Sequence, residues 1–267
     1  RLTELTGAPL PGFESMVACP ELGNPNPWFT TVDDRMFFTA HDLEHGFELW
    51  VSDGSAERSQ IVTDLHPGTD CSYLAHFTAV GAKVFFIEYS HPDRWDLMVS
   101  DGTPQGTNLV KTLALEPVES SPAPGFAALG DLLIFSSYDP LHGVELWVSD
   151  GTEQDTGLLK DIVAGVAGSH PVGFSNVGDR VFFVASGPDD GGTLWVTDGT
   201  EQGTLPFPFR TEQQAGLWAD GVVANFHGLL FGVDCGLWVS DGTSEGTRLV
   251  RDFGGGQGIA TIFERTE

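Results

Sequence analysis

A phrase of eight residues recurs five times along this chain of 267 residues, and it constrains the fold more than any other feature. The copies read ELWVSDGS at 48–55, DLMVSDGT at 96–103, ELWVSDGT at 145–152, TLWVTDGT at 193–200 and GLWVSDGT at 236–243. Their third residues, Trp50, Met98, Trp147, Trp195 and Trp238, are spaced by 48, 49, 48 and 43 residues. Such a period indicates one supersecondary unit copied five times.

Each copy lies among four strand signals. A first run, apolar at both ends with small residues between, lies at 29–32, 77–80, 126–129, 174–177 and 223–226. After a two-residue turn, a bulky second run lies at 36–38, 84–86, 133–135, 181–183 and 230–231. The phrase is the third strand, and a fourth run lies at 60–62, 108–110, 157–159, 204–206 and 248–250. Short turns of this kind are typical of antiparallel hairpins.

The repeats predict an all-β fold, namely a five-bladed β-propeller of four-stranded antiparallel blades. One such sheet cannot cover its own faces, whereas blades stacked in a ring cover one another. We place the propeller at 25–257, with repeats at about 25–66, 67–115, 116–164, 165–212 and 213–253. Residues 1–24 and a strand or tail at 258–267 flank it, and one terminus is expected to clasp the ring. A linear solenoid is the rival architecture.

The third copy carries a longer pattern, HGVELWVSDGTEQDTGLLKDI, from His142 to Ile162, and parts of it return in every other copy. The pattern resembles the ELWxxDGT repeat family of bacterial proteins, mostly secreted or at the cell surface, over roughly residues 29–252. The resemblance implies a secreted or cell-surface location and no particular activity. Because Met98 replaces Trp, Thr193 replaces Glu and Cys235-Gly236 shorten the fifth copy, five identical ligand sites are not expected.

The charge balance restricts the partners. The chain has 12 basic and 38 acidic residues, a net charge of −26. Such a surface repels nucleic acid and anionic membranes, and it favours solubility and cations. No run is long and apolar enough to span a bilayer as a helix. We therefore expect a glycan or a protein as the ligand, without nucleic acid or membrane insertion, and the oligomeric state stays open.

The Asp-Gly pair of each phrase has two interpretations. Acidic oxygens suit calcium, but the loop lacks the alternating carboxylates of a calcium loop. A hairpin turn, in which Asp accepts backbone N–H groups and Gly takes a positive φ, explains both residues. The Trp residues are interpreted as packing between blades. Cys19 and Cys71 are either a disulfide or buried free thiols, with Cys235 as the third cysteine.

The longer, more varied loops are the candidates for function. Because strands alternate in direction, second–third loops and inter-blade linkers share one end of the blades. The ends of the second strands place His41, Tyr89, Tyr138, Ser186 and Cys235 at equivalent positions there, with Glu88 and Asp234 one residue earlier in their copies. Trp95 and Trp218 lie in the same loops. If these strand ends converge over the channel mouth, His41, Glu88, Tyr89, Trp95, Tyr138, Ser186, Trp218 and Asp234 are candidate ligand-binding residues.

Three functions compete. A binding module would stack Tyr and Trp on a glycan or protein and hydrogen-bond its polar groups. A metal site would use His41, His91 and Cys235, which suit zinc or copper better than calcium, although no cofactor is assured. A hydrolytic or lyase enzyme would use Glu88 with Asp234, or His41 as a general base, but no local catalytic motif supports it. We favour the binding module, with a purely structural scaffold as the remaining alternative.

Overall fold

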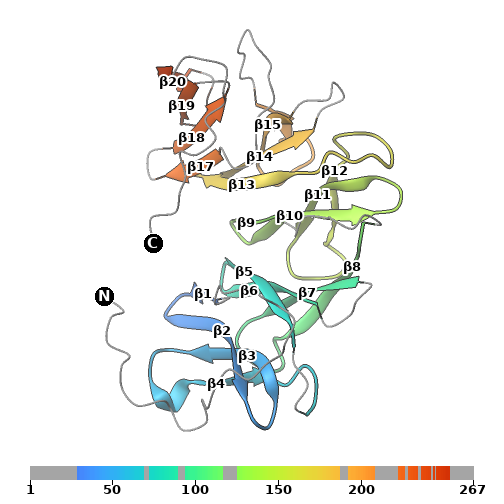
Figure 1. Cartoon of the computed structure of the whole chain (residues 1–267), viewed down its shortest axis with the longest axis vertical. Coiled ribbons are helices and arrows are strands. Elements are labelled where there is room, and N and C mark those ends of the chain that lie inside the picture. The colour runs from blue at the N-terminus through green and yellow to red at the C-terminus, as the bar shows by residue number, and fades with distance from the viewer. Residues whose placement is uncertain are drawn as a thin grey trace. The chain divides into compact units, whose positions relative to one another are not determined.

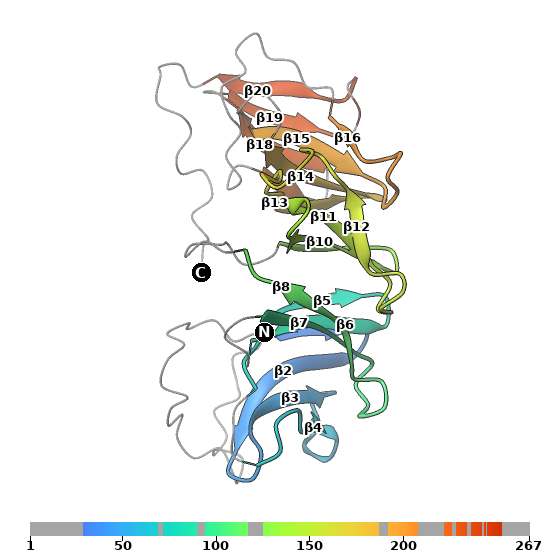
Figure 2. The same ribbon diagram turned by 90° about the vertical axis from the view of Figure 1, so that its right-hand side faces the viewer.

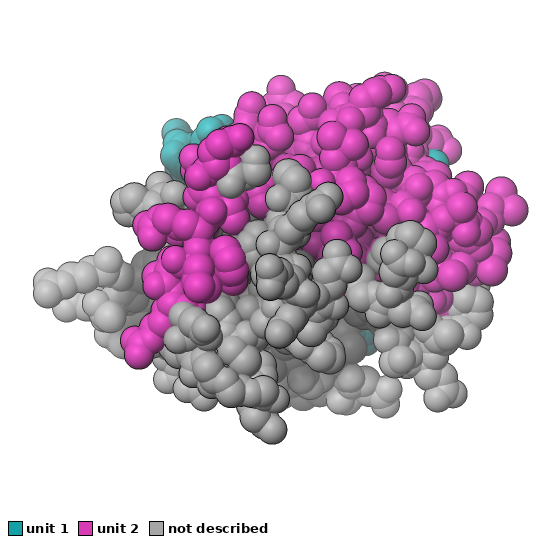
Figure 3. Space-filling model, turned by 90° about the horizontal axis from the view of Figure 1, so that it is seen from above, with its two compact units in different colours: residues 1–112 teal, residues 113–267 magenta. Residues whose placement is uncertain are grey.

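The computed structural model describes residues 29–68, 72–89, 94–116, 125–186, 192–207, 222–225, 228–233, 236–241, 243 and 245–252. Two compact units divide the chain, Arg1–Thr112 and Leu113–Glu267, called here the N-terminal and the C-terminal unit (Figure 3). The N-terminal unit holds repeats 1 and 2, and the C-terminal unit holds repeats 3 to 5.

Four strands are described in each repeat (Figures 1 and 2). Repeat 1 consists of β1 (Phe29–Val32), β2 (Arg35–Asp42), β3 (Gly46–Ser52) and β4 (Gln60–Thr63), with a single-turn 3₁₀ helix at Ala56–Arg58. Repeat 2 consists of β5 (Leu74–Val80), β6 (Lys83–Glu88), β7 (Arg94–Ser100) and β8 (Asn108–Ala114). Repeat 3 consists of β9 (Phe126–Leu129), β10 (Leu132–Asp139), β11 (Gly143–Ser149) and β12 (Gly157–Lys160). Repeat 4 consists of β13 (Val172–Val177), β14 (Arg180–Ser186), β15 (Gly192–Thr197) and β16 (Leu205–Pro206), and repeat 5 of β17 (Val222–Asn225), β18 (Gly228–Val233), β19 (Gly236–Ser240) and β20 (Arg248–Asp252).

Within every repeat the strands are antiparallel and pair in chain order, first with second, second with third and third with fourth. The register is also repeated. Phe38 faces Trp50 across β2 and β3, Phe135 faces Trp147 across β10 and β11, and Phe183 faces Trp195 across β14 and β15. The four predicted strands of each repeat are confirmed. Phe231 faces Trp238 across β18 and β19, however, so the count that leads from Phe38 to His41 leads in repeat 5 to Asp234. The predicted equivalence of Cys235 with His41 is therefore wrong by one residue, because the second strand of repeat 5 was aligned one position out of register.

The core of each unit lies between successive sheets. In the N-terminal unit, Phe37 and Leu49 of repeat 1 pack with Val84 and Phe86 of repeat 2. In the C-terminal unit, one cluster joins repeat 3 to repeat 4 and includes Trp195, which is 9% exposed and stacks on Phe183. Because successive side chains of a strand point to opposite faces, a sheet whose strands are apolar throughout has an apolar face on each side. The interpretation of the phrase tryptophans as packing residues is therefore supported.

The Ser-Asp-Gly-Thr segment forms a hydrogen-bonded turn between the third and fourth strands. In repeat 2, Asp101 Oδ1 accepts hydrogen bonds from the backbone N–H and the hydroxyl of Thr103, at 2.9 and 2.7 Å. Ser100 Oγ lies 2.7 Å from Thr107 Oγ1, which donates to the Thr103 carbonyl. Gly102 has a φ of +87°. The hairpin interpretation of the Asp-Gly pair is supported by this network.

The same turn is present in the other repeats. The aspartate contacts the hydroxyl two residues later at Asp53, Asp150, Asp198 and Asp241. Hydrogen bonds from that hydroxyl hold the pKa of Asp53, Asp101, Asp198 and Asp241 below its ordinary value. These carboxylates therefore serve the turn as charged acceptors.

A side chain from the preceding repeat closes over this turn. Arg35 Nη1 donates to the carbonyl of Asp101 at 2.8 Å, and its guanidinium lies 5.4 Å from the centre of the Phe37 ring. A Cβ on Gly102 would lie 2.6 Å from Arg35 Nη1. In the C-terminal unit, Leu132 takes the place of Arg35, and a Cβ on Gly199 would lie 3.1 Å from its Cδ1. Glycine is thus required for two reasons, the positive φ and the close approach of a side chain from the preceding repeat.

Two glycine substitutions separate these requirements. Gly54 has a φ of +90°, and a Cβ added to it would meet nothing within 4 Å, so Gly54→Ala should cost about 1 kcal/mol from backbone strain alone. Gly102→Ala adds displacement of Arg35 and crowding of the Phe37 ring, and we expect it to cost roughly 1 kcal/mol more. Urea unfolding of both variants measures the difference. Equal losses would show that the close approach of Arg35 and Phe37 adds nothing to the requirement for glycine.

Candidate functional site

The glutamate of the ELW phrase is a buried anchor for the linker to the next repeat. Glu48 is 0% exposed, and its carboxylate accepts hydrogen bonds from Leu65 N, His66 N and Ser72 Oγ at 3.1, 3.3 and 2.7 Å. Glu145 is equally buried and accepts from Ile162 N, Val163 N and Ser169 Oγ. A carboxylate held by three donors fixes the path of each linker.

Burial raises the pKa of Glu48 and Glu145 above its ordinary value, and the three donors oppose that rise. The same geometry in both units makes this glutamate a structural residue. In repeat 2 its place is taken by Asp96, which accepts from Thr112 Oγ1 at 2.7 Å. This role of the glutamate is not predicted from the sequence, because nothing local in the sequence shows which backbone groups a strand side chain will reach.

The first linker brings His66 to Glu88, the final residue of β6. His66 Nε2 lies 2.6 Å from Glu88 Oε1, and the two side chains are 32% and 8% exposed. The equivalent pair in the C-terminal unit is Val163, held by Glu145 as His66 is held by Glu48, and Ala185. The imidazole–carboxylate pair is therefore a departure from the repeat rather than a requirement of it.

His41 belongs to the same junction between repeats 1 and 2. It shares a face of β2 with Phe37, because side chains two and four residues apart on a strand point the same way. Glu88 shares a face of β6 with Phe86 for the same reason, and Phe37 and Phe86 lie in one core cluster. The ring of His41 lies 5.1 Å from that of Phe47. We call His41, His66 and Glu88 the first-seam site.

Tyr89 and Trp95 lie on the opposite face of repeat 2 from Glu88. Their rings are in edge contact at 5.3 Å, and the His76 ring lies 6.2 Å from Tyr89. Burial raises the pKa of Tyr89 and lowers that of His76. His76 has a φ of +59°, whereas the equivalent position in repeat 4 is Gly173, with a φ of +68°. A left-handed histidine carries backbone strain, and the sequence alone did not indicate it.

The remaining predicted site residues divide into two groups. Tyr138 pairs with Val144 and Ser186 with Gly192 in the C-terminal unit, and Ser186 N donates to the Ser169 carbonyl at 2.7 Å. Trp218, Asp234, His91 and Cys235 lie outside the described residues, as do Cys19 and Cys71. Among the described residues, no three His, Cys, Asp or Glu side chains are grouped to hold a metal ion. Within the same residues, no helix has the length and apolar character needed to cross a membrane.

Two other histidines belong to turns between the second and third strands. His45 Nδ1 lies 2.8 Å from Asp42 Oδ2, and His142 Nδ1 lies 2.8 Å from Asp139 Oδ2. Each aspartate also accepts the backbone N–H of its histidine. The hydrogen bond that His142 donates to Asp139 raises the pKa of His142 above its ordinary value, and the bond to Asp42 does the same for His45. These contacts explain both histidines as turn residues.

Removing the partner should therefore lower the imidazole pKa. In Asp139→Asn we expect the pKa of His142 to return toward 6.5, measured by an NMR titration of the imidazole. Because folding favours the protonated ring, this pair stabilises the protein below pH 6.5, and that contribution is lost as the pH rises through the raised pKa. The exposed Asp131, changed to Asn, is the control and should leave His142 unchanged. An unaltered pKa in Asp139→Asn would contradict the pairing.

The first-seam site can act in two ways. A carboxylate beside Nε2 orients the imidazole, so the pair is suited to hydrogen-bond a polar ligand. An imidazole oriented by a carboxylate also provides two of the three members of a nucleophilic triad. The third member, a nucleophile, must lie within hydrogen-bond reach of the imidazole. The hydrogen bonds of the described residues connect no serine, threonine or cysteine to His66.

No family model matches the chain, and no curated protein matches it. Solved structures with a similar fold do match the chain. A puromycin-hydrolyzing peptidase from Mycobacterium tuberculosis is 12% identical, with a TM-score of 0.54 over 84% of this chain and 37% of that chain. An acylaminoacyl peptidase from Pyrococcus horikoshii is 9% identical, with a TM-score of 0.50 over 84% and 38%. The β-propeller domain of the Trilobed protease from Pyrococcus furiosus is 10% identical, with a TM-score of 0.47 over 83% and 69%.

At these identities the likeness concerns the fold alone. Together with the repeated strand order, it shows an all-β chain built from propeller-like, four-stranded antiparallel sheets. The chain spans little more than a third of the length of the two peptidases. What those peptidases act on is therefore no guide to the residues of the first-seam site.

Proposed function

We propose that the chain is a secreted or surface-exposed recognition module of the ELWxxDGT type, in which a five-bladed propeller holds a glycan or a protein ligand. The ligand lies at the end of the sheets formed by second–third loops and inter-repeat linkers. The observation that carries the proposal is the His66–Glu88 pair at 2.6 Å. The equivalent residues in the C-terminal unit, Val163 and Ala185, are apolar, so the repeat fold does not require the His66–Glu88 pair.

The chemistry of the pair favours a polar ligand. Glu88 is nearly buried and already bonded to His66, whereas His66 keeps a third of its surface in solvent. An exposed imidazole donates to hydroxyl, carbonyl or carboxylate oxygens, which are the groups that glycans and protein segments present. His41 and its contact with Phe47 add an aromatic surface at the same junction. Rigid sheets position these side chains at low entropic cost on binding.

The C-terminal unit supplies the substitutions that test the proposal. The double variant His66→Val and Glu88→Ala copies the equivalent pair Val163 and Ala185, so the fold should be kept while the polar site is removed. Wild type and variant are compared on glycan and peptide arrays, and each hit is measured by calorimetry. We expect binding to weaken by about tenfold or more, with the midpoint of thermal unfolding changed little.

The control is Arg58→Gln, which removes the ion pair of Arg58 with Asp53 from the third–fourth turn of repeat 1, at the other end of the sheet. It should keep ligand affinity. The recognition proposal fails if arrays show no ligand, or if the first-seam variant binds every ligand as tightly as wild type does.

A hydrolytic or lyase enzyme is the second candidate, because His66 oriented by Glu88 resembles the base of a triad. An enzyme and a recognition module are distinguished by whether the ligand is chemically changed. An enzyme converts an array ligand into product, and Glu88→Gln slows that conversion more than it weakens binding. A transition metal bound by His41, His91 and Cys235 would show as stoichiometric zinc or copper in protein purified without chelator.

Five blades in a closed ring complete the proposed architecture, and one exposed residue supports it. Val250 of β20 is 48% exposed. The equivalent residues Val62 of β4 and Leu159 of β12 are 2% and 8% exposed, and each lies in a core cluster with the following repeat. An apolar residue that the repeat buries elsewhere is expected to be covered when the ring closes.

Aspartate substitutions test the closure. Val62→Asp places a charge in a core and should cost about 3 kcal/mol or more. In a closed ring, Val250→Asp should cost a comparable amount. In an open array of sheets, it should change the free energy of unfolding by less than about 0.5 kcal/mol. Urea unfolding of the two variants distinguishes these architectures.

A further inference from the structure

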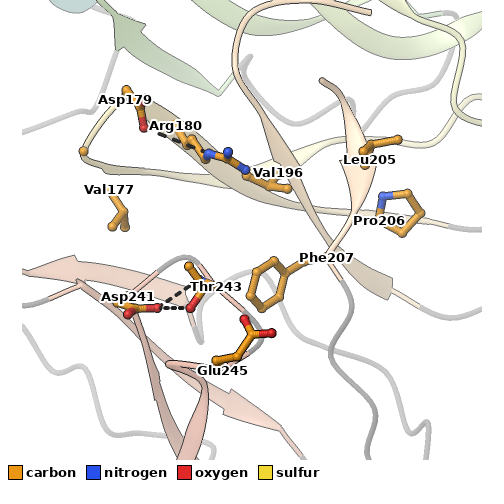
Figure 4. Close-up of a pocket in the computed structure, with 11 residues that line it drawn as sticks. Val177, Asp179, Arg180, Val196, Leu205, Pro206, Phe207, Asp241, Thr243 and Glu245 are labelled. Atoms are coloured by element: carbon orange, nitrogen blue, oxygen red, sulfur yellow. Dashed lines mark hydrogen bonds and ion pairs between the residues drawn. The ribbon is translucent and has the colours of Figure 1, made fainter. Parts of the chain in front are cut away.

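A hollow of about 500 Å³ lies between repeats 4 and 5 in the C-terminal unit (Figure 4). It lies at the end of the sheets that carries the first–second and third–fourth turns, away from the loops and linkers of the proposed function. Its walls come from the β13–β14 turn, from β15 and β16, and from the Asp-Gly-Thr turn after β19. Its volume is in the range of pockets that hold small ligands.

The other described junctions are filled at this place. Between repeats 1 and 2, Arg35 reaches across and donates to the Asp101 carbonyl. Between repeats 3 and 4, Leu132 packs close to Gly199. Arg180 of repeat 4 is equivalent to Arg35, and Asp241 of repeat 5 is equivalent to Asp101. Arg180 Nε, however, lies 4.0 Å from Oδ1 of Asp179, its neighbour in the chain. The junction that the repeat closes elsewhere is therefore left open here.

The hollow carries charges of both signs, because Arg180 lies beside Asp179 on one side and two further carboxylates lie on the other. In Figure 4 the Arg180 side chain lies on one side, and the carboxylates of Asp241 and Glu245 lie on the other, with the Phe207 ring between them. The Arg180 side chain is 50% exposed. Hydrogen bonds from Thr243 lower the pKa of Asp241, so its charge persists at neutral pH. A ligand seated here meets a cation and anions at once.

The surface between these charges is apolar. Val196 and Phe207 are each 5% exposed, and Leu205, which is 53% exposed, stands at the rim with Pro206. An apolar body would gain free energy mainly by covering Leu205 and Pro206, because Val196 and Phe207 are already nearly buried. A ligand that is only anionic would be repelled by Asp179, Asp241 and Glu245, and one that is only cationic would have no carboxylate to pair with Arg180.

We propose that this hollow binds a zwitterionic small molecule with an apolar side chain, an apolar α-amino acid or a very short peptide, with its carboxylate on Arg180 and its ammonium group facing Asp241 and Glu245. A guanidinium pairs with a carboxylate through two parallel N–H···O bonds. The apolar side chain lies on Leu205 and Pro206, at the rim beside Phe207. The site is independent of the first-seam site, which lies in the N-terminal unit.

Calorimetry of the full chain with three probes tests the proposal. The probes are L-phenylalanine, phenethylamine, which lacks the carboxylate, and 3-phenylpropanoate, which lacks the ammonium group. We expect phenylalanine to bind with a Kd of about 1 mM or tighter, and each single-charge probe to bind at least about tenfold more weakly. Absence of heat with phenylalanine up to about 10 mM, or equal binding of all three probes, would overturn the proposal.

Variants of the two walls locate the binding. Arg180→Gln should weaken phenylalanine about tenfold and leave phenethylamine unchanged or tighter, whereas Glu245→Gln should leave 3-phenylpropanoate unchanged or tighter. Both residues are exposed, so the thermal midpoint should stay within about a degree or two of wild type. Arg58→Gln, at an arginine that is 78% exposed on the turn of repeat 1, is the control and should bind phenylalanine as wild type does. Equal phenylalanine affinity in wild type and Arg180→Gln overturns the assignment.

Discussion

The hydrogen-bonded turn after each third strand is the interaction on which the rest of this structure depends. In each repeat a serine or threonine and an aspartate satisfy the turn from within, and a hydroxyl seven residues later completes the network. The turn sets the register between third and fourth strands, because hairpin register follows turn geometry. It also presents a glycine to the preceding repeat, so that Arg35 or Leu132 can close over it. One local motif thus connects strand pairing to the packing of successive sheets.

The buried glutamate of the ELW phrase acts in the same way at the other end of the sheet. Glu48 and Glu145 hold the linkers that lead into the next repeat, and their cost of burial is offset by three donors each. Because the scaffold is held by repeated contacts, positions outside those contacts are free to vary. His66 with Glu88, and Arg180 opposite Asp241, are such positions, and both candidate sites arise where a repeat contact is replaced or left unmade.

Much of the fold could be predicted, because its signals are local. Alternating apolar runs, two-residue turns and the recurring phrase each fix a strand or a hairpin without reference to distant residues. The turn role of the Asp-Gly pairs followed from side-chain chemistry alone. The candidate site was harder. Glu88 was identified, but its partner His66 was not, because the two are 22 residues apart and meet only through the linker that Glu48 holds. The prediction also grouped Glu88 with Tyr89. Because strand side chains alternate, Glu88 at the end of β6 and Tyr89 directly after it point to opposite faces of the sheet.

The sequence by itself determined the repeat, its strands, their order, the acidic surface and the turn chemistry, since each depends on residues close together in the chain. Only the tertiary structure decided which side chains meet across a junction. The contact of His66 with Glu88, the strained backbone of His76, and the hollow beside Arg180 all depend on how neighbouring sheets and their linkers pack. Packing joins residues that are distant in sequence, and a period of 48 residues describes what the repeats share rather than where they differ.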